Sequence, residues 1–248
     1  MEKTWVTFVS LAGLLALWYG AALLTADPMV LPTPDAVWQV IAEQSASGKL
    51  WFHIGHTLRR VVLAFVLAMV IGGIIGVALG QSARLNQWLD PWVTVFLNIP
   101  ALVIIVLCYL WIGLNETAAI IAVAMNKTAM VIVTVREGVR SMDRSVTEMA
   151  QVYRMSPWAR LRHVVWPQLG PFVATATRNG LAVIWKIVLV VEFLGRSNGV
   201  GFQIHLYFQL FNTASVLAYA FSFTALMLLI EYLLVQPWEK RSSAWRHV

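Results

Sequence analysis

Long apolar runs divide this chain into segments that predict membrane-spanning helices. Three of the runs hold no charged residue and are long enough to cross the hydrocarbon core as helices: 5–25, 61–80 and 91–115. Three further runs carry isolated ionisable residues: 117–135, 172–195 and 213–236. The pattern predicts an all-α integral membrane protein with six transmembrane helices.

The first run must be distinguished from a secretory signal peptide. Its flank, Met1-Glu2-Lys3, has no net side-chain charge, its apolar core is too long, and no clean small-x-small cleavage site precedes Asp27. We therefore expect a retained helix.

The segments between the runs are short. In the segment 27–50, two prolines precede an acid and an amphipathic run, which predicts a short helix at the membrane interface. We expect a turn at 81–90, a tight turn at 113–116 and an aromatic-rich connection at 196–212. The expected organisation is a first helix with an outer segment over 1–55, a core of five spans over 56–240 that includes a polar loop at 137–170, and a tail at 241–248.

Composition and charge support this topology. Of the 248 residues, 59% are hydrophobic and 12% charged, which excludes an ordinary soluble domain. With six spans, eleven Lys and Arg residues fall on the side of the termini and four on the other side, so both termini and the loop at 145–167 are expected to be cytoplasmic. The net charge of +6 then reflects topology and anionic lipid, and its spread over several loops argues against nucleic-acid binding.

The residues needed for catalysis or cofactor binding do not cluster. The single cysteine, Cys108, falls inside a span, and the five histidines are scattered, so we expect no disulfide, no metal site and no membrane enzyme. No G-x-x-x-x-G-K-[ST] motif occurs, so the chain does not itself bind nucleotide phosphates. No cofactor is expected.

Some residues inside the spans predict packing or a kink. Gly72, Gly76 and Gly80 recur every four residues and line one helix face, where another helix can approach closely. Asn98 and Pro100 predict a kink, because proline removes a backbone donor. The kink either lines a cavity or is purely structural.

Ionisable residues inside the spans are candidates for a translocation path. Lys127 falls near the middle of its span, where a charge costs about 2.5–3.5 kcal/mol on insertion scales. It either faces a water-filled path or reaches solvent from a position nearer the end. Lys186 and Glu192, six residues apart, do not share a helix face, so one is expected to face a cavity and the other an interface.

The loop SVTEMAQVYRMSPWARLRHVVWP combines basic and aromatic residues with helix signals. Ser145 and Glu148 have the spacing of a capping box, and the helix they start should end near Arg154. Ser156 and Pro157 predict the start of a second helix, which Pro167 is expected to end. Such a hairpin is either a solvated surface element or a docking element for a soluble partner.

This loop resembles the EAA loop of the permeases of ATP-binding-cassette importers. Glu148, Ala150 and Pro167 match that pattern directly, and Val164 and Trp166 stand at its Ile and Leu positions. The stretches HTLRRVVLAFVLAMVIGGIIGVALG, YLWIGLNETAAI, EGVRSMD and WKIVLVVEFLGRSNGVGF resemble successive pieces of the nitrate, taurine and alkanesulfonate branch. Two departures are Arg154, where the family has glycine, and NKTAM, where the fourth span of the family often carries Phe-Pro.

The resemblance implies a type-I importer permease fold in a bacterial inner membrane. A homodimer of this chain would form the path for a small, anionic, sulfonate- or nitrate-like solute, a dimeric ATPase would bind the loop, and an extracytoplasmic binding protein would deliver the solute. The expected coupling residues are Glu148, Ala150, Arg154, Pro157, Val164, Trp166 and Pro167. The expected path residues are Asn98, Pro100, Asn126, Lys127, Lys186 and Glu192. The alternative is a secondary transporter, or another polytopic membrane protein, that works without an ATPase.

Overall fold

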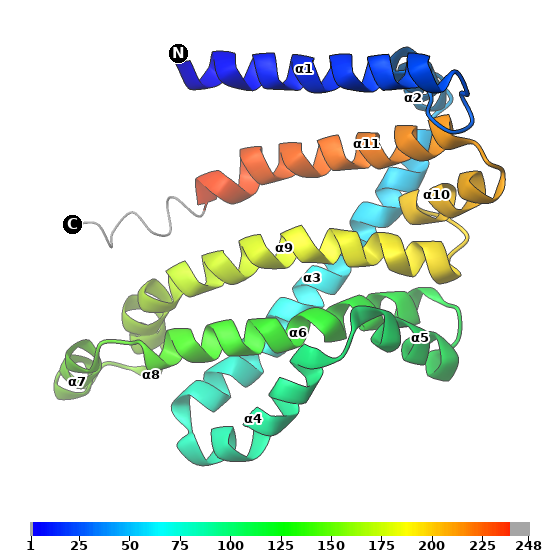
Figure 1. Cartoon of the computed structure of the whole chain (residues 1–248). Coiled ribbons are helices and arrows are strands. Elements are labelled where there is room, and N and C mark those ends of the chain that lie inside the picture. The colour runs from blue at the N-terminus through cyan, green and yellow to red at the C-terminus, as the bar shows by residue number, and fades with distance from the viewer. Residues whose placement is uncertain (1, 239–248) are drawn as a thin grey trace. The chain divides into compact units, whose positions relative to one another are not determined.

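The computed structural model describes residues 2–238, which fold into helices joined by short connections (Figure 1). These helices are α1 (Glu2–Thr25), α2 (Pro34–Ala46), α3 (Lys49–Gln81), α4 (Ala83–Asn98), α5 (Ala101–Ile112), α6 (Glu116–Arg140), α7 (Arg144–Val152), α8 (Pro157–Arg160), the π-helix η1 (Leu161–Val165), α9 (Trp166–Gly195), α10 (Val200–Gln209), α11 (Thr213–Ile230) and the π-helix η2 (Glu231–Val235). The all-α prediction is confirmed for these residues. The predicted tail at 241–248 lies outside the part of the chain that the structure describes.

The chain divides into two compact units. Within the described residues, one unit comprises 2–57 and 192–227, and the other comprises 58–191 and 228–238. Helices α3, α9 and α11 each begin in one unit and end in the other.

Most of the predicted spans correspond to helices suited to a membrane. Length and composition qualify four of them: Trp5–Thr25, Lys49–Gln81, Glu116–Arg140 and Thr213–Trp238. Helices α4 and α5 qualify together as a fifth, broken span. Helix α9 has 30 residues, which is long enough, but it carries Arg178, Lys186 and Glu192.

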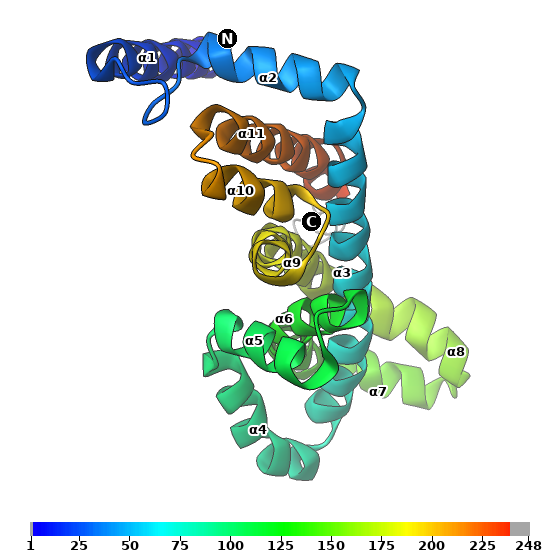
Figure 2. The same ribbon diagram turned by 90° about the vertical axis from the view of Figure 1, so that its right-hand side faces the viewer.

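The span predicted at 91–115 is bent far more sharply than a kinked helix. Helices α4 and α5 meet at 96°, and Figure 2 shows α5 beside α6 while α4 turns away. The break follows from Pro100, because the residue before a proline avoids the helical region, and Ile99 is extended at φ −71° and ψ 125°. The turn predicted at 81–90 is also wrong. Ser82 caps α4 by accepting from the Leu85 N–H, and the helix continues through Pro91.

Helix α3 begins a dozen residues before the predicted span. Arg59 and Arg60, which were expected in an outer connection, therefore lie inside this helix. The Arg60 side chain is only 1% exposed, and its Nε and Nη2 atoms each lie 2.9 Å from a carboxylate oxygen of Glu116, the first residue of α6. Burial of the guanidinium is tolerated because the bidentate ion pair satisfies it.

The second unit is built around α6, whose buried face consists largely of alanine. Ala118, Ala119 and Ala122 pack with apolar residues of α3, α5 and α9. Small side chains let neighbouring helices approach closely, and that approach provides the van der Waals contact that drives association in lipid.

The glycine face of α3 makes the closest of these helix contacts. A Cβ atom added at Gly72 would lie 2.7 Å from the Val131 Cβ, and one added at Gly80 would lie 2.5 Å from the Val139 Cβ. At Gly76 it would lie 2.8 Å from the Ile132 carbonyl oxygen. The predicted close packing is confirmed, and its partner is α6 of the same chain.

The first unit joins α1, α2 and α11. The Trp18 ring lies 5.5 Å from the Phe221 ring, and its Nε1–H donates to the Pro32 carbonyl at 3.0 Å. The Tyr219 hydroxyl lies 3.2 Å from the Gln44 Oε1 atom. Helix α2 starts at Pro34, so the short helix predicted after the two prolines is confirmed.

We predict that Gly76→Ala destabilises the chain while Gly73→Ala does not. The new methyl group at position 76 meets α6, and overpacking of this kind typically costs about 1–3 kcal/mol. Nothing lies within 4 Å of a Cβ at position 73, so that change only gains helix propensity, about 1 kcal/mol. Thermal unfolding in detergent, followed by tryptophan fluorescence, should give a lower Tm for the first variant only. Equal Tm values would contradict the close packing.

Candidate functional site

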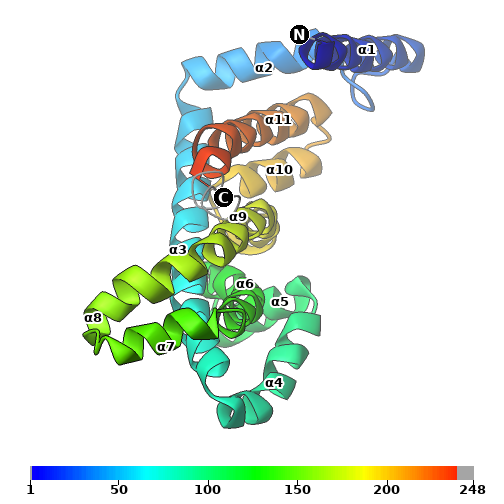
Figure 3. The same ribbon diagram turned by 90° about the vertical axis from the view of Figure 1, so that its left-hand side faces the viewer.

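The second unit contains a helical hairpin between α6 and α9. Helices α7 and α8 lie side by side, and α7 packs against η1 (Figure 3). The prediction of two short helices separated by a bend is confirmed. The second helix does not end at Pro167, however, because α8, η1 and α9 follow one another without a break and Pro167 lies in the first turn of α9. The Trp166 N–H donates to the Leu161 carbonyl, five residues earlier, as in a π-helix. The next residue, Pro167, has no N–H and so leaves a gap in the α-helical hydrogen bonds.

Asp143, and not Ser145, caps the start of the hairpin. Its carboxylate accepts from the Ser145 N–H at 2.8 Å and from the Ser145 hydroxyl, so the predicted capping box is wrong. The hydroxyl bond and then the backbone bond lower the pKa of Asp143, which keeps the cap ionised at neutral pH. The Asp143 N–H also donates to the Gln168 side chain at 2.8 Å, which ties the start of α7 to α9. Glu148 lies on the exposed side of α7.

Arg154 makes the bend of the hairpin in a left-handed conformation, with φ of +47°. Its N–H donates to the Gln151 carbonyl at 2.9 Å, and the Met155 N–H donates to the Ala150 carbonyl at 3.0 Å. These two bonds define a Schellman motif, in which glycine usually takes the place of Arg154. For an arginine the conformation costs about 1–2 kcal/mol. The bend of the family pattern is thus made without its glycine.

The second helix of the hairpin starts as predicted. The Ser156 hydroxyl accepts from the Ala159 N–H at 3.2 Å, and Pro157 is the first residue of α8. A hydroxyl cap followed by proline at the first helical position satisfies the free amides at the helix start.

The hairpin has a buried inner face and an apolar exposed face. Ala150 and Val164 are buried, so the small size of Ala150 serves packing inside the chain, and not the close approach of a partner. The exposed face includes Val152 at 79%, Tyr153 at 75% and Trp158 at 69%, while Trp166 and Pro167 are exposed at the base. Clustered exposed apolar side chains of this size mark an interaction surface.

Lys127 is the least compensated charge on α6. It is only 2% exposed, and its one hydrogen-bond partner among the described residues is the Met130 Sδ atom, 2.7 Å from Nζ. A Cβ atom at Gly180 of α9 would lie 3.2 Å from the Lys127 Cε, and the Phe65 ring borders the same place. The alternative in which this lysine reaches solvent is therefore not observed.

Two ion pairs mark the depth of Lys127 in the membrane. Glu116 at the start of α6 pairs with Arg60, and Arg136 near the other end pairs with Asp90 of α4. At about 1.5 Å per residue, the stretch from Glu116 to Arg136 is about 30 Å long, which matches the hydrocarbon core. Lys127 lies near the middle of that stretch.

The other expected path residues do not hydrogen-bond to Lys127. Asn126 is its half-buried neighbour on α6, and Lys186 is exposed on α9, with Nζ 5.6 Å from the centre of the Trp185 ring. The Asn98 side chain donates to the Thr94 carbonyl at 2.7 Å, and Pro100 is the N-cap of α5. Both of these residues shape the break between α4 and α5.

Glu192 lies in the first unit, where it holds a connection in place. Its carboxylate is fully buried and accepts from the Thr57 hydroxyl at 2.9 Å and from the Gly201 N–H at 2.8 Å. The Gly199 N–H donates to His53 Nδ1 at 3.1 Å. The carboxylate therefore fastens the start of α10 to α3 and α9.

The sequence reasoning missed the partners of Glu192. Thr57 carries no sequence signal, and His53 was counted only as one of the five scattered histidines. Gly199 offered a signal, because a glycine in the turn RSNGVG marks a position that needs positive φ, and its φ is +110°.

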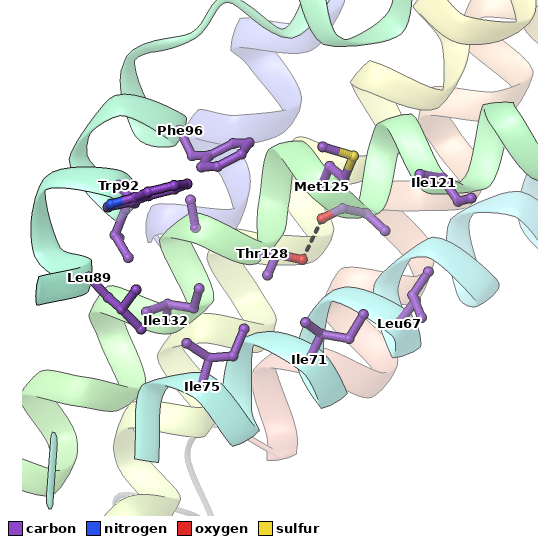
Figure 4. Close-up of a pocket in the computed structure, with 13 residues that line it drawn as sticks. Leu67, Ile71, Ile75, Leu89, Trp92, Phe96, Ile121, Met125, Thr128 and Ile132 are labelled. Carbon is purple, nitrogen blue, oxygen red and sulfur yellow. Dashed lines mark hydrogen bonds between the residues drawn. The ribbon is translucent and has the colours of Figure 1, made fainter. Parts of the chain in front are cut away.

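A pocket of about 540 Å³ lies between α3, α4 and α6 in the second unit (Figure 4). Its lining is apolar, with Ile71 on α3, Trp92 and Phe96 on α4, and Met125 on α6. The one hydroxyl in the lining, on Thr128, donates to the Ala124 carbonyl at 2.7 Å. Because the lining is almost wholly apolar, the pocket is poorly suited to a charged solute.

We predict that Gly199→Ala disrupts the α9–α10 connection more than Gly48→Ala disrupts its own turn. Both glycines have positive φ, but only the methyl group at position 199 meets the Glu192 carboxylate, whereas nothing lies within 4 Å at position 48. Backbone strain acts at both positions and is larger at Gly199, whose φ of 110° and ψ of 168° are adopted almost only by glycine, and the contact with Glu192 adds to it. Limited proteolysis and Tm should show a clear loss for Gly199→Ala alone. Equal losses would show that backbone strain accounts for both.

Comparison with known proteins gives a consistent family. Residues 64–236 match the family described as "Binding-protein-dependent transport system inner membrane component". The putative aliphatic sulfonates transport permease protein SsuC of Escherichia coli (strain K12) is 33% identical over 191 residues, 77% of this chain and 73% of the relative. The riboflavin transport system permease protein RibX of Chloroflexus aurantiacus is 33% identical over 242 residues, 96% of this chain and 88% of the relative.

A third relative and a solved structure agree with this family. The taurine transport system permease protein TauC of Escherichia coli (strain K12) is 28% identical over 242 residues, 95% of this chain and 88% of the relative. An inward-facing structure of the MetNI methionine ABC transporter has the same fold, with a TM-score of 0.67 at 17% identity. That match covers 79% of this chain and 97% of the solved chain.

Proposed function

Because this chain belongs to the family of binding-protein-dependent transport system inner membrane components, the permease subunits of ATP-driven importers, we propose that it imports a small solute carrying an anionic group. The observation that carries this proposal is the buried ammonium group of Lys127 near the middle of α6. A charge in the membrane interior is expensive, and such residues usually mark the route of a substrate or ion.

The surroundings of Lys127 favour an anion as its partner. The thioether sulfur of Met130 is a weak acceptor, and no carboxylate pairs with Lys127 among the described residues. An anionic group that passes would supply the missing acceptor and would be transiently stabilised. Asn126 beside it adds an amide to the same part of α6.

The names of the relatives agree with an anionic solute without requiring one. SsuC and TauC are named for aliphatic sulfonates and taurine, whose sulfonate group is anionic at neutral pH. RibX is named for riboflavin, which carries no such group, so the family as a whole does not dictate the charge of the solute. The names of the relatives therefore leave the charge of the solute open, and the proposal of an anionic solute rests on the chemistry of Lys127.

Family membership places this chain in the inner membrane and implies an ATPase subunit and a substrate-binding protein as its partners. We further propose that two copies of this chain enclose the path, so that each contributes one Lys127. The basic residues of the hairpin and its neighbours favour a cytoplasmic hairpin and cytoplasmic termini. In this orientation the exposed face of the hairpin meets the ATPase.

We predict that Lys127→Met abolishes uptake of an anionic solute, whereas Lys127→Arg retains part of it. Uptake should be measured in vesicles containing the whole importer, with labelled taurine, ethanesulfonate, nitrate and riboflavin as probes. Loss of one buried charge contact is expected to reduce uptake at least about tenfold. Basal ATP hydrolysis should persist, because the hairpin is unchanged.

Lys49→Met is the matched control, since Lys49 is exposed at the start of α3 and is not among the expected path residues. Parent-like uptake by Lys127→Met would rule out a role for this lysine in the path. Uptake of riboflavin alone would overturn the anionic solute.

We predict that Trp158→Ala weakens ATPase retention and that Trp88→Ala does not. Both indole rings are largely exposed, at 69% and 78%, but only Trp158 lies on the hairpin. Truncation of an aromatic anchor at an interface commonly costs about 2–4 kcal/mol, which is at least about tenfold in affinity. The measurement is a pull-down of the ATPase subunit by each purified permease variant. If both variants retain the ATPase equally, the hairpin is a solvated element and not the coupling contact.

A further inference from the structure

We infer that Arg154 recognises a carboxylate on the ATPase subunit and so helps to determine which ATPase this permease accepts. The inference rests on the proposed function, in which the hairpin meets the ATPase. It adds the chemistry of the contact and a reason for an arginine at a position where the family pattern has glycine.

The backbone of Arg154 supplies the first observation. Only three non-glycine residues of the described chain have positive φ, namely Ala26, Arg154 and Phe211, and Arg154 is the one that carries a charge. Glycine would form the same Schellman bend without strain. A side chain kept in a strained conformation points to a use for that side chain.

The second observation is that the side chain does not hold the hairpin together. Arg154 is exposed and forms no ion pair within residues 2–238. The bend itself is fixed by backbone bonds to the Ala150 and Gln151 carbonyls and by the cap at Ser156. The guanidinium group is therefore available to another molecule.

The surroundings of Arg154 define the chemistry of that molecule. Val152, Tyr153 and Trp158 are all exposed at the same turn of the hairpin. A partner that covers these apolar side chains also removes water from the guanidinium group, and a desolvated charge needs an opposite charge nearby. Arginine matches a carboxylate with two parallel hydrogen bonds, so an apolar cleft that contains an Asp or Glu fits this surface.

Two other roles for the same arginine have to be separated from this one. A cation at the C-terminal end of α7 interacts favourably with the helix dipole, which is a purely structural effect. Anionic lipid is a second possible counter-ion. The hairpin follows the end of α6, beyond the Arg136 ion pair that marks the membrane boundary, which favours the soluble subunit.

The experiment uses the full-length permease in detergent, without added anionic lipid, and its cognate ATPase subunit. Variants Arg154→Gly and Arg154→Asn both accept positive φ and remove the charge. Arg154→Lys keeps the charge but lacks the planar guanidinium that makes two parallel hydrogen bonds, and Arg154→Glu reverses the charge. Arg162→Glu is the matched control, because Arg162 is also exposed on the hairpin. The readouts are ATPase affinity at low and high salt, and the Tm of each permease alone.

We expect Arg154→Gly and Arg154→Asn to bind the ATPase at least tenfold more weakly at an unchanged or higher Tm. Arg154→Lys should lie between these variants and the parent, Arg154→Glu should bind most weakly, and Arg162→Glu should bind like the parent. Replacement of one acidic residue in the ATPase cleft by Arg should restore binding to Arg154→Glu.

Three results would overturn the inference: parent-like affinity of the glycine and asparagine variants, weaker binding that is accompanied by a lower Tm, or an effect that appears only when anionic lipid is added. The Trp158→Ala result separates the two proposals. If Trp158→Ala weakens binding and the Arg154 variants do not, only the carboxylate contact is wrong. If neither weakens binding, the hairpin is not the site of contact.

Discussion

The close contact between α3 and α6 at Gly72, Gly76 and Gly80 is the constraint on which the second unit depends. In a membrane, helices gain little by hiding apolar side chains from lipid tails that are equally apolar. Their association relies on close van der Waals contact, which only small residues allow. The glycines of α3 let Val131, Val135 and Val139 of α6 approach closely, and α5 and α9 complete the packing around α6. Lys127 is buried because its own helix is held this tightly.

The ionisable groups of the chain follow one physical rule with one exception. Arg60 is paired with Glu116, Arg136 is paired with Asp90, and Glu192 accepts hydrogen bonds from a hydroxyl and a backbone amide. Each arrangement offsets the loss of water around a charge. Lys127 has only a thioether sulfur. Within residues 2–238, Lys127 therefore contrasts with Arg60, Arg136 and Glu192, and this contrast is the basis of the proposal that a solute supplies the missing anionic partner.

The sequence predicted features that depend on neighbouring residues and missed those that depend on distant ones. The glycine spacing and the Ser156 cap of α8 are local, and both were confirmed, as were most of the apolar runs. The early start of α3 was missed because the partner that buries Arg60 lies far along the chain, at Glu116. The capping box at Ser145 failed because the helix is capped two residues earlier, by Asp143, which accepts from the Ser145 N–H.

The predicted site shows the same division between local and distant information. The motif of the hairpin and the charge of Lys127 could be recognised in the sequence, since both stand out from their surroundings. The sequence could not show that Ala150 faces inward, because the burial of a residue on a short helix depends on where the next helix lies. The role of Glu192 was equally hidden, since Thr57 and Gly201 become its partners only through the fold.

The unbroken helix from α8 through η1 into α9 has a mechanical consequence. No loop separates the hairpin from α9, so a displacement of the hairpin is transmitted directly along one continuous helix. Pro167 and Pro171 each leave one hydrogen bond of the ladder unmade, and η1 beside them is wound more widely than the rest. The helix is therefore stiff along its length except at this one joint. If a bound partner displaces the hairpin, we expect the helix to bend at this joint before it bends elsewhere, because fewer hydrogen bonds hold it there.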